Sequence, residues 1–110
     1  MTKKLCSVLS LVIIISMLLT GCGNYSAKDI GDKLDNLEKI GYYTKTYYSS
    51  TYYASKNGEY VFIYVKEDTS SAKEFYEYIK NKYPGDVVER DKNIIYLGTT
   101  RRVVNDARQC

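Results

Sequence analysis

The chain has 110 residues, with 16 basic and 13 acidic side chains, three cysteines and no histidine. This length supports one domain with a single modest core. The lack of histidine removes the commonest general base and metal ligand. The sequence also has no CxxC pair and no phosphate-binding or dinucleotide-binding glycine pattern, so it indicates no enzyme class, metal or cofactor. Its basic residues form no concentrated run, which argues against nucleic acid as a partner.

The N-terminal segment has the pattern of a secretory signal peptide. Two lysines, Lys3 and Lys4, precede an apolar run over residues 5–19. That run is shorter than the roughly 20 residues that a membrane-spanning helix needs. The small residues Thr20 and Gly21 follow it, and Cys22 comes directly after them. A basic start, a short apolar segment and small residues at its end predict that residues 1–21 are removed.

The sequence Leu19-Thr20-Gly21-Cys22 resembles the lipobox of bacterial lipoprotein precursors. The resemblance implies that a diacylglycerol is attached to the sulfur of Cys22 and that a dedicated signal peptidase recognises Leu19, Thr20 and Gly21 and cuts after Gly21. Acyl chains such as palmitate then hold the protein on the outer face of the cell membrane, since two or more chains anchor stably where one does not. The alternative is a transmembrane helix with an incidental cysteine. The resemblance covers residues 1–22 and implies nothing about the remaining fold.

The mature chain is expected to consist of a lipidated cysteine and a short tether, residues 22–25, followed by one domain, residues 26–110. Without Lys3 and Lys4 its side-chain charge is nearly neutral. Once Cys22 is acylated, Cys110 has no partner within the mature chain, so we expect no disulfide to stabilise the fold. Cys110 is then a free thiol, an intermolecular bridge or an incidental chain end. Abundant Tyr, Lys, Ile and Asn indicate AT-rich coding, typical of a low-GC Gram-positive host.

The first predicted element of the domain is a helix from Ser26 or Ala27 to about Ile40. Ser26 followed by Asp29 is typical of an N-cap, and Gly41 is a predicted helix end. Helical spacing places one apolar stripe on Ile30, Leu34, Leu37 and Ile40.

A hairpin is predicted next, because strand-like residues 42–53 and 59–67 flank Asn57-Gly58, the strongest short hairpin signal. A two-residue turn sets the facing residues. On the predicted core face, Tyr52 faces Ile63, Ala54 faces Val61, and Ser50 faces Val65. On the other face the pairs are Tyr53 with Phe62 and Thr51 with Tyr64.

The rest of the chain predicts a helix, two short strands and a last helix. Thr69, Ser70 or Ser71 is expected to cap the helix over residues 70–82, with Ser71 and Glu74 as a capping box, and Pro84-Gly85 to end it. Strands are expected at residues 87–90 and 93–97, joined through Asp91-Lys92, and a helix at residues 101–108 after Thr99 or Thr100. The apolar positions of the two helices are Ala72, Phe75, Tyr76, Ile79, Tyr83, Val103, Val104 and Ala107.

These elements predict the α+β class, with the order α-β-β-α-β-β-α and an antiparallel sheet that carries its helices on one face. The carboxylates suggest no catalytic group. The first group of carboxylates is Asp29, Asp32 and Asp35, and the second is Asp86, Glu89 and Asp91. We interpret both groups as solvated side chains, with a calcium site as the alternative for the second group. The protein is therefore expected not to be an enzyme.

Tyrosine is the remaining signal, because all 13 tyrosines follow Cys22. Tyrosine combines a large contact area with a hydrogen-bonding tip and is common at recognition surfaces. Strand propensity and codon bias are the alternative explanation. We expect Tyr47, Tyr53 and Tyr64 to form a surface of a non-catalytic binding or accessory module that contacts another envelope protein or a glycan. The alternative function is a protective lipoprotein that excludes a toxin or a phage, and a toxin gene or phage-derived gene as neighbour would favour it.

Overall fold

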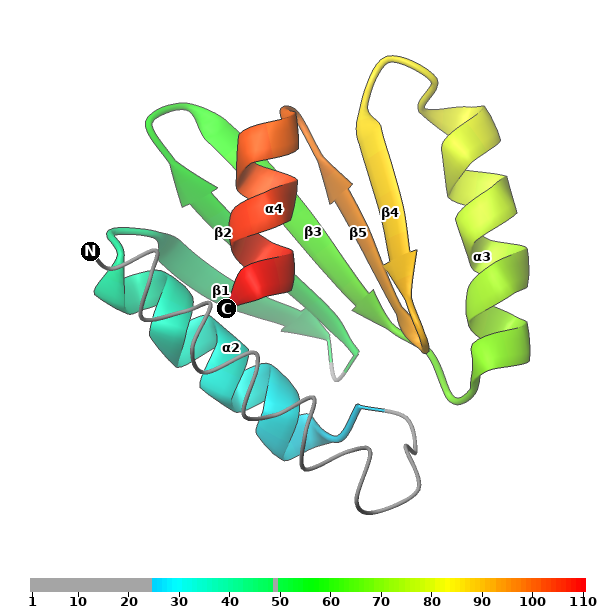
Figure 1. Ribbon diagram of the computed structural model, residues 1–110, viewed down its shortest axis with the longest axis horizontal. Coiled ribbons are helices and arrows are strands. Elements are labelled where there is room, and N and C mark those ends of the chain that lie inside the picture. Colours follow the sequence, from blue (N-terminus) through cyan, green and yellow to red (C-terminus); the bar gives the residue numbers. More distant parts are fainter. Residues whose placement is uncertain (1–24, 49) are drawn as a thin grey trace.

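The structure is a computed structural model that describes residues 25–48 and 50–110. The predicted signal peptide, the lipobox and Cys22 lie outside these residues. The elements follow one another along the chain as shown in Figure 1. They are α2 (Ala27–Lys39), β1 (Tyr43–Tyr48), β2 (Thr51–Lys56), β3 (Glu59–Val65), α3 (Thr69–Lys82), β4 (Val87–Asp91), β5 (Ile94–Gly98) and α4 (Arg101–Gln109).

The strands form one antiparallel sheet in the order β1-β2-β3-β5-β4. The predicted α+β class and antiparallel sheet are confirmed. The element order differs by one strand, because residues 42–53 do not form a single strand. Only Thr51–Lys56 pairs with β3, and the first half of the stretch folds back on β2 as the edge strand β1.

The predicted register of the β2–β3 hairpin is confirmed. Tyr52 faces Ile63, and Ala54 faces Val61. Asn57 and Gly58 both have positive φ, 55° and 81°, which a type I′ turn requires and which glycine adopts without steric cost. The turn therefore sets which side chains of β2 and β3 share a face.

The predicted N-caps are confirmed for two of the three helices. Ser26 and Asp29 form the predicted capping box of α2, and Thr100 caps α4. The predicted capping box of Ser71 and Glu74 is wrong, because α3 begins at Thr69. Asp68 caps it instead and accepts a hydrogen bond from the Ser71 N–H at 2.7 Å. The link between β4 and β5 is also one residue later than expected, since both Asp91 and Ile94 are paired in the sheet.

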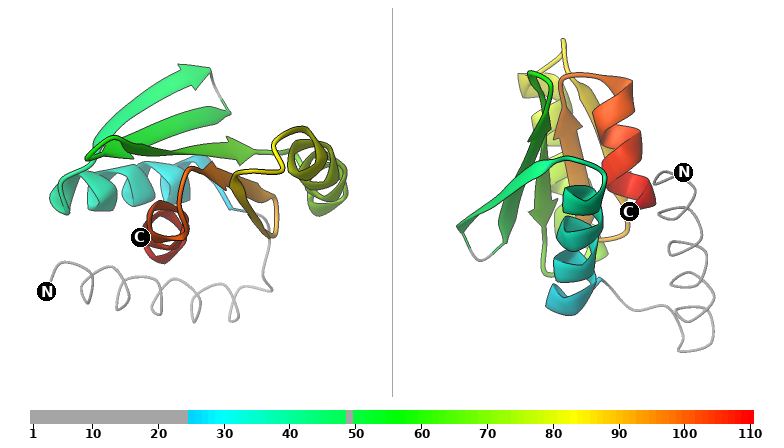
Figure 2. Two further views of the ribbon diagram at one scale, coloured as in Figure 1. Left: turned by 90° about the horizontal axis from the view of Figure 1, so that it is seen from above. Right: turned by 90° about the vertical axis from the view of Figure 1, so that its left-hand side faces the viewer.

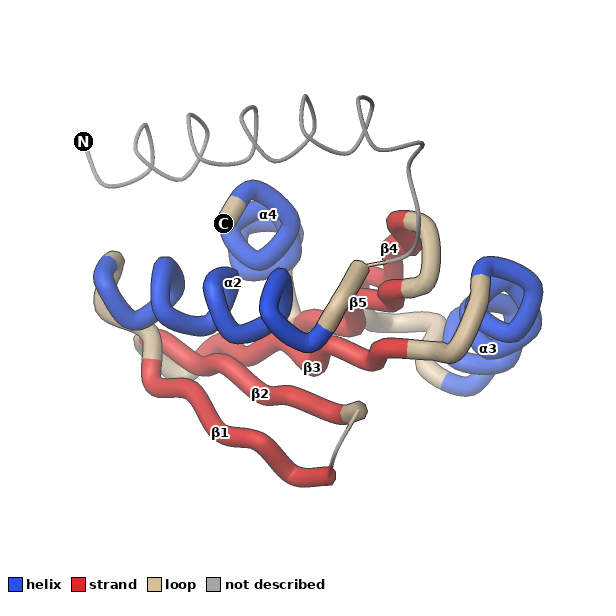
Figure 3. Tube along the Cα trace, turned by 90° about the horizontal axis from the view of Figure 1, so that it is seen from below, coloured by secondary structure: helices blue, strands red, loops and turns tan. Residues whose placement is uncertain are grey.

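The helices do not all lie on one face of the sheet. Figures 2 and 3 show α2 and α4 on one side, with α3 at the far end beside β4 and β5. The ring of Phe75 on α3 contacts Tyr64 with 4.9 Å between centroids, and Tyr64 points away from the side of Val61 and Ile63. α3 lies there because every residue of β5 is buried, so this strand needs cover on both of its faces.

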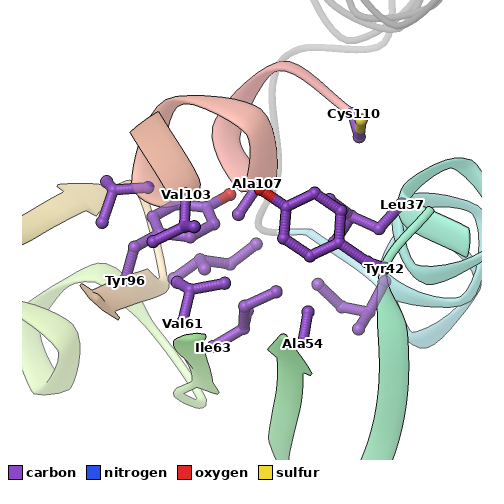
Figure 4. Packing of buried hydrophobic residues seen from close by; sticks show 12 residues of the cluster. Leu37, Tyr42, Ala54, Val61, Ile63, Tyr96, Val103, Ala107 and Cys110 are labelled. Atoms are coloured by element: carbon purple, nitrogen blue, oxygen red, sulfur yellow. The ribbon is translucent and has the colours of Figure 1, made fainter. Parts of the chain in front are cut away.

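The main core lies between the sheet and the pair α2 and α4 (Figure 4). Val61 and Ile63 of β3 are fully buried there, as the alternation of β3 predicted. Tyr42 also lies in this core, and its hydroxyl donates a 2.7 Å hydrogen bond to Asp106. Over residues 25–48 and 50–110, no helix combines the length and the apolar character needed to cross a membrane.

Candidate binding surface

A continuous row of aromatic rings crosses the sheet on the face opposite α2 and α4. We call it the aromatic strip and define it by Tyr47, Tyr53, Tyr60, Phe62, Tyr64, Phe75 and Tyr78. Neighbouring rings have centroids 4.9 to 6.2 Å apart, within the range of favourable aromatic contacts. The strip begins on the edge strand β1 and ends on α3.

Strand alternation explains why these rings share one face. Residues 60, 62 and 64 of β3 point to the same side, and the hairpin turn places Tyr53 opposite Phe62. The pairing of β1 with β2 is irregular between Thr46 and Tyr48. There the ring of Tyr47 meets both Tyr53, at 5.8 Å, and Phe62, at 6.1 Å.

The strip is most accessible at its two ends. Tyr47 is 45% exposed and Tyr78 is 55% exposed, whereas the rings between them are half-buried. Burial raises the pKa of Tyr64, so its hydroxyl stays protonated well into the alkaline range. The strip is therefore a partly solvated face and not a closed core.

The structure brings together the three tyrosines named from the sequence. Tyr47 contacts Tyr53, and both Tyr53 and Tyr64 contact Phe62. The sequence did not indicate the contribution of α3, and it gave the lysines no role. Lysine ammonium groups lie over three rings of the strip: Lys45 over Tyr47 at 5.0 Å, Lys66 over Phe75 at 3.8 Å, and Lys82 over Tyr78 at 5.4 Å. Such cation–π contacts hold positive charge at the face of the ring.

The strand carboxylates lie on the other side of the sheet. Glu59 is 4.0 Å from Arg102, and Glu89 is 3.3 Å from Arg101 on α4. Asp91 accepts a 2.7 Å hydrogen bond from the hydroxyl of Tyr25. The calcium alternative for Asp86, Glu89 and Asp91 gains no support, because no group of three or more metal-ligating side chains occurs in the part of the chain that the structure describes. The carboxylates of the α2 group include Asp29, which completes the capping box with Ser26, and Asp32, which pairs with Lys28.

A buried polar cluster joins α2 to the end of α4. The ammonium group of Lys33 donates to the carbonyl oxygens of Ala107, at 2.6 Å, and Arg108, at 3.3 Å, and the Asn36 amide donates to the Cys110 carbonyl at 3.2 Å. Burial lowers the pKa of Lys33 to about 8. These donors satisfy carbonyl groups that a helix end leaves free, so we assign the cluster a structural role.

The expectation that no disulfide involves Cys110 is contradicted, because Cys110 is buried and disulfide-bonded. The other cysteines of the chain, Cys6 and Cys22, lie outside the described residues. The expectation concerned a mature chain in which Cys6 is removed and Cys22 is acylated. The full chain retains both of these cysteines, and a disulfide to Cys22 would exclude its lipidation.

Comparisons with protein-family models, with curated proteins and with solved structures found no match to this chain.

Proposed function

We propose that the protein is a lipoprotein held on the outer face of the cell membrane through Cys22, and that it is a non-catalytic binding module. Its partner is another component of the cell envelope, which contacts the aromatic strip. The signal-peptide pattern and the lipobox support the anchor. The single observation that supports the binding role is the continuous strip itself, which is partly exposed along a sheet face that α2 and α4 leave uncovered.

Lipidation predicts a defined mass for the protein extracted from membranes. We expect a chain that starts at Cys22 and carries added acyl mass, measured as intact mass without reducing agent. Cys22→Ala is expected to leave the chain uncut and without acyl mass, whereas the control Cys6→Ala is processed normally because it lies outside the lipobox. An uncut wild-type chain, or one with Cys22 in a disulfide, would contradict the anchor.

The binding role predicts that changes at the exposed ends of the strip prevent partner recovery. We expect Tyr47→Ser combined with Tyr78→Ser to abolish co-purification of envelope components from membranes, because both rings lose their contact area. Adding Tyr53→Ser and Tyr64→Ser tests the half-buried middle, with thermal unfolding as a check on the fold. Tyr43→Ser is the matched control, since Tyr43 is 61% exposed on β1 and shares the face of the strip, but takes part in none of the ring contacts that define it. Unchanged recovery from the double variant would count against the proposal.

A further inference from the structure

The strands separate charge between the two faces of the sheet. Strand pairing places Glu59, Glu89 and Asp91 on the helix side, in line with Val61, Ile63 and Ile94. The opposite face, which carries the strip, has no carboxylate among its strand positions within residues 25–48 and 50–110. Those positions are Tyr43, Lys45, Tyr48, Thr51, Tyr53, Ser55, Tyr60, Phe62, Tyr64, Val88, Arg90, Ile95 and Leu97. The strand part of this face is therefore aromatic and basic. The helix α3, which completes the strip, carries Glu74 and Glu77 as well as Lys73, Lys80 and Lys82.

The lysines at the strip leave their positive charge available to a ligand. Lys45 and Lys82 are exposed, and within the described ranges neither they nor Lys66 form an ion pair with a carboxylate. Each ammonium group lies over an aromatic ring. A ligand lying along the strip thus meets ring faces and positive charges together.

The strip also faces away from the proposed anchor. Tyr25 begins the described domain on the helix side of the sheet, where its hydroxyl donates to Asp91 and its N–H to Asn93 at 2.9 Å. Only residues 23 and 24 separate it from Cys22, so the anchor lies within about 10 Å of Tyr25 along an extended chain. The ligand is then a component of the envelope outside the membrane and not the bilayer surface.

We propose that the aromatic strip binds an anionic polysaccharide. Sugar rings stack on the tyrosine and phenylalanine faces, and acidic groups along the polymer pair with Lys45, Lys66 and Lys82. A protein partner fits less well, because lysine is depleted in protein interfaces. Single-stranded nucleic acid also uses aromatic stacking and positive charge, but the outer membrane face favours a glycan. This inference rests on the proposed function and names the class of its ligand.

Calorimetric titration of the detergent-solubilised protein tests the proposal, with oligogalacturonate as the probe. We expect it to bind at least about tenfold more tightly than a neutral malto-oligosaccharide or polyglutamate, because only oligogalacturonate supplies both sugar rings and charge. Added salt is expected to weaken binding. Tyr47→Ser and Lys45→Gln should each raise the Kd several-fold. Lys39→Gln removes an exposed charge from the last turn of α2, on the helix side, and is expected to leave the Kd unchanged.

Several results would overturn the proposal. These are no binding of oligogalacturonate, equal binding of polyglutamate, no effect of Tyr47→Ser, or tighter binding of phosphatidylglycerol vesicles or oligothymidylate. Failure of this proposal can be distinguished from failure of the proposed binding role. If oligogalacturonate does not bind but Tyr47→Ser with Tyr78→Ser still abolishes partner recovery, the ligand class is wrong and the binding role stands.

Discussion

Gly98→Ala is expected to lower the free energy of unfolding by about 2 to 3 kcal/mol. A Cβ atom at residue 98 would lie 2.6 Å from a methyl group of Val104 and 3.1 Å from one of Val103. Both valines are buried on α4, and branching at Cβ leaves them few alternative rotamers. The added methyl group therefore pushes α4 away from β5 and disrupts the core between them. Urea unfolding followed by circular dichroism measures the loss.

Two further variants separate this steric effect from a general effect of replacing glycine. Gly31→Ala on α2 meets no atom within 4 Å and is expected to stabilise the protein by about 0.5 to 1 kcal/mol, because alanine favours a helix interior. Val104→Ala in the Gly98→Ala background removes the closest methyl group. Val104→Ala should lower the free energy of unfolding less in the Gly98→Ala background than in the wild-type protein. A Gly98→Ala variant as stable as the wild type would disprove the close packing of α4 on β5.

The free energy of unfolding is expected to rise between about pH 8 and pH 10, by at most about 3 kcal/mol, because of Lys33. Burial lowers the pKa of Lys33 from its usual 10.5 to about 8 in the folded protein. Between these values the unfolded chain binds more protons than the folded one, so raising the pH favours folding. The charges that act on Lys33 are Asp91 and Asp29, which raise its pKa, and Arg108, which lowers it.

Tyrosines reverse the trend at higher pH. Burial and hydrogen bonds to carboxylates raise the pKa of Tyr25 and Tyr42, and burial raises that of Tyr96. Above about pH 10 the unfolded chain loses tyrosine protons that the folded protein keeps, so stability falls. Urea unfolding of the wild type and of Lys33→Met at several pH values tests the assignment. We expect Lys33→Met to show no rise below pH 10, and an equal rise in both proteins would exclude Lys33 as its cause.

Much of the fold follows from short-range signals in the sequence. Asn57-Gly58 and the alternation of Val61, Ile63 and Val65 predicted both the hairpin register and the core face. β1 was missed because residues 42–53 keep the same strand-forming character throughout, and Ser49-Ser50 is only a weak turn signal. Which face of the sheet α3 packs against depends on long-range contacts. The unbroken apolar run of β5, Ile94–Leu97, was the signal that both faces are covered.

The aromatic strip could be predicted only in part, again because some of its contacts depend on long-range packing. Alternation along the hairpin places Tyr53 and Tyr64 on one face, so the sequence indicated them directly. The contact between Phe75 and Tyr64 joins residues of different elements, and the stripe of α3 does not reveal which sheet face the helix covers. The role of the lysines could not be predicted either, because the sequence does not show which aromatic ring a lysine side chain lies over.

β5 is an interior strand of the sheet although it is the last of the described strands to be synthesised. It fills the place between β3 and β4, and Leu97 pairs with Phe62, far earlier in the chain. The core also requires Val103 and Val104 of α4. Until the ribosome has added these residues, β3 and β4 have no common neighbour and α2 has no helix to pack against. The core of the described domain is therefore completed only after α4 has been added, and a chain exported as we propose folds after that point.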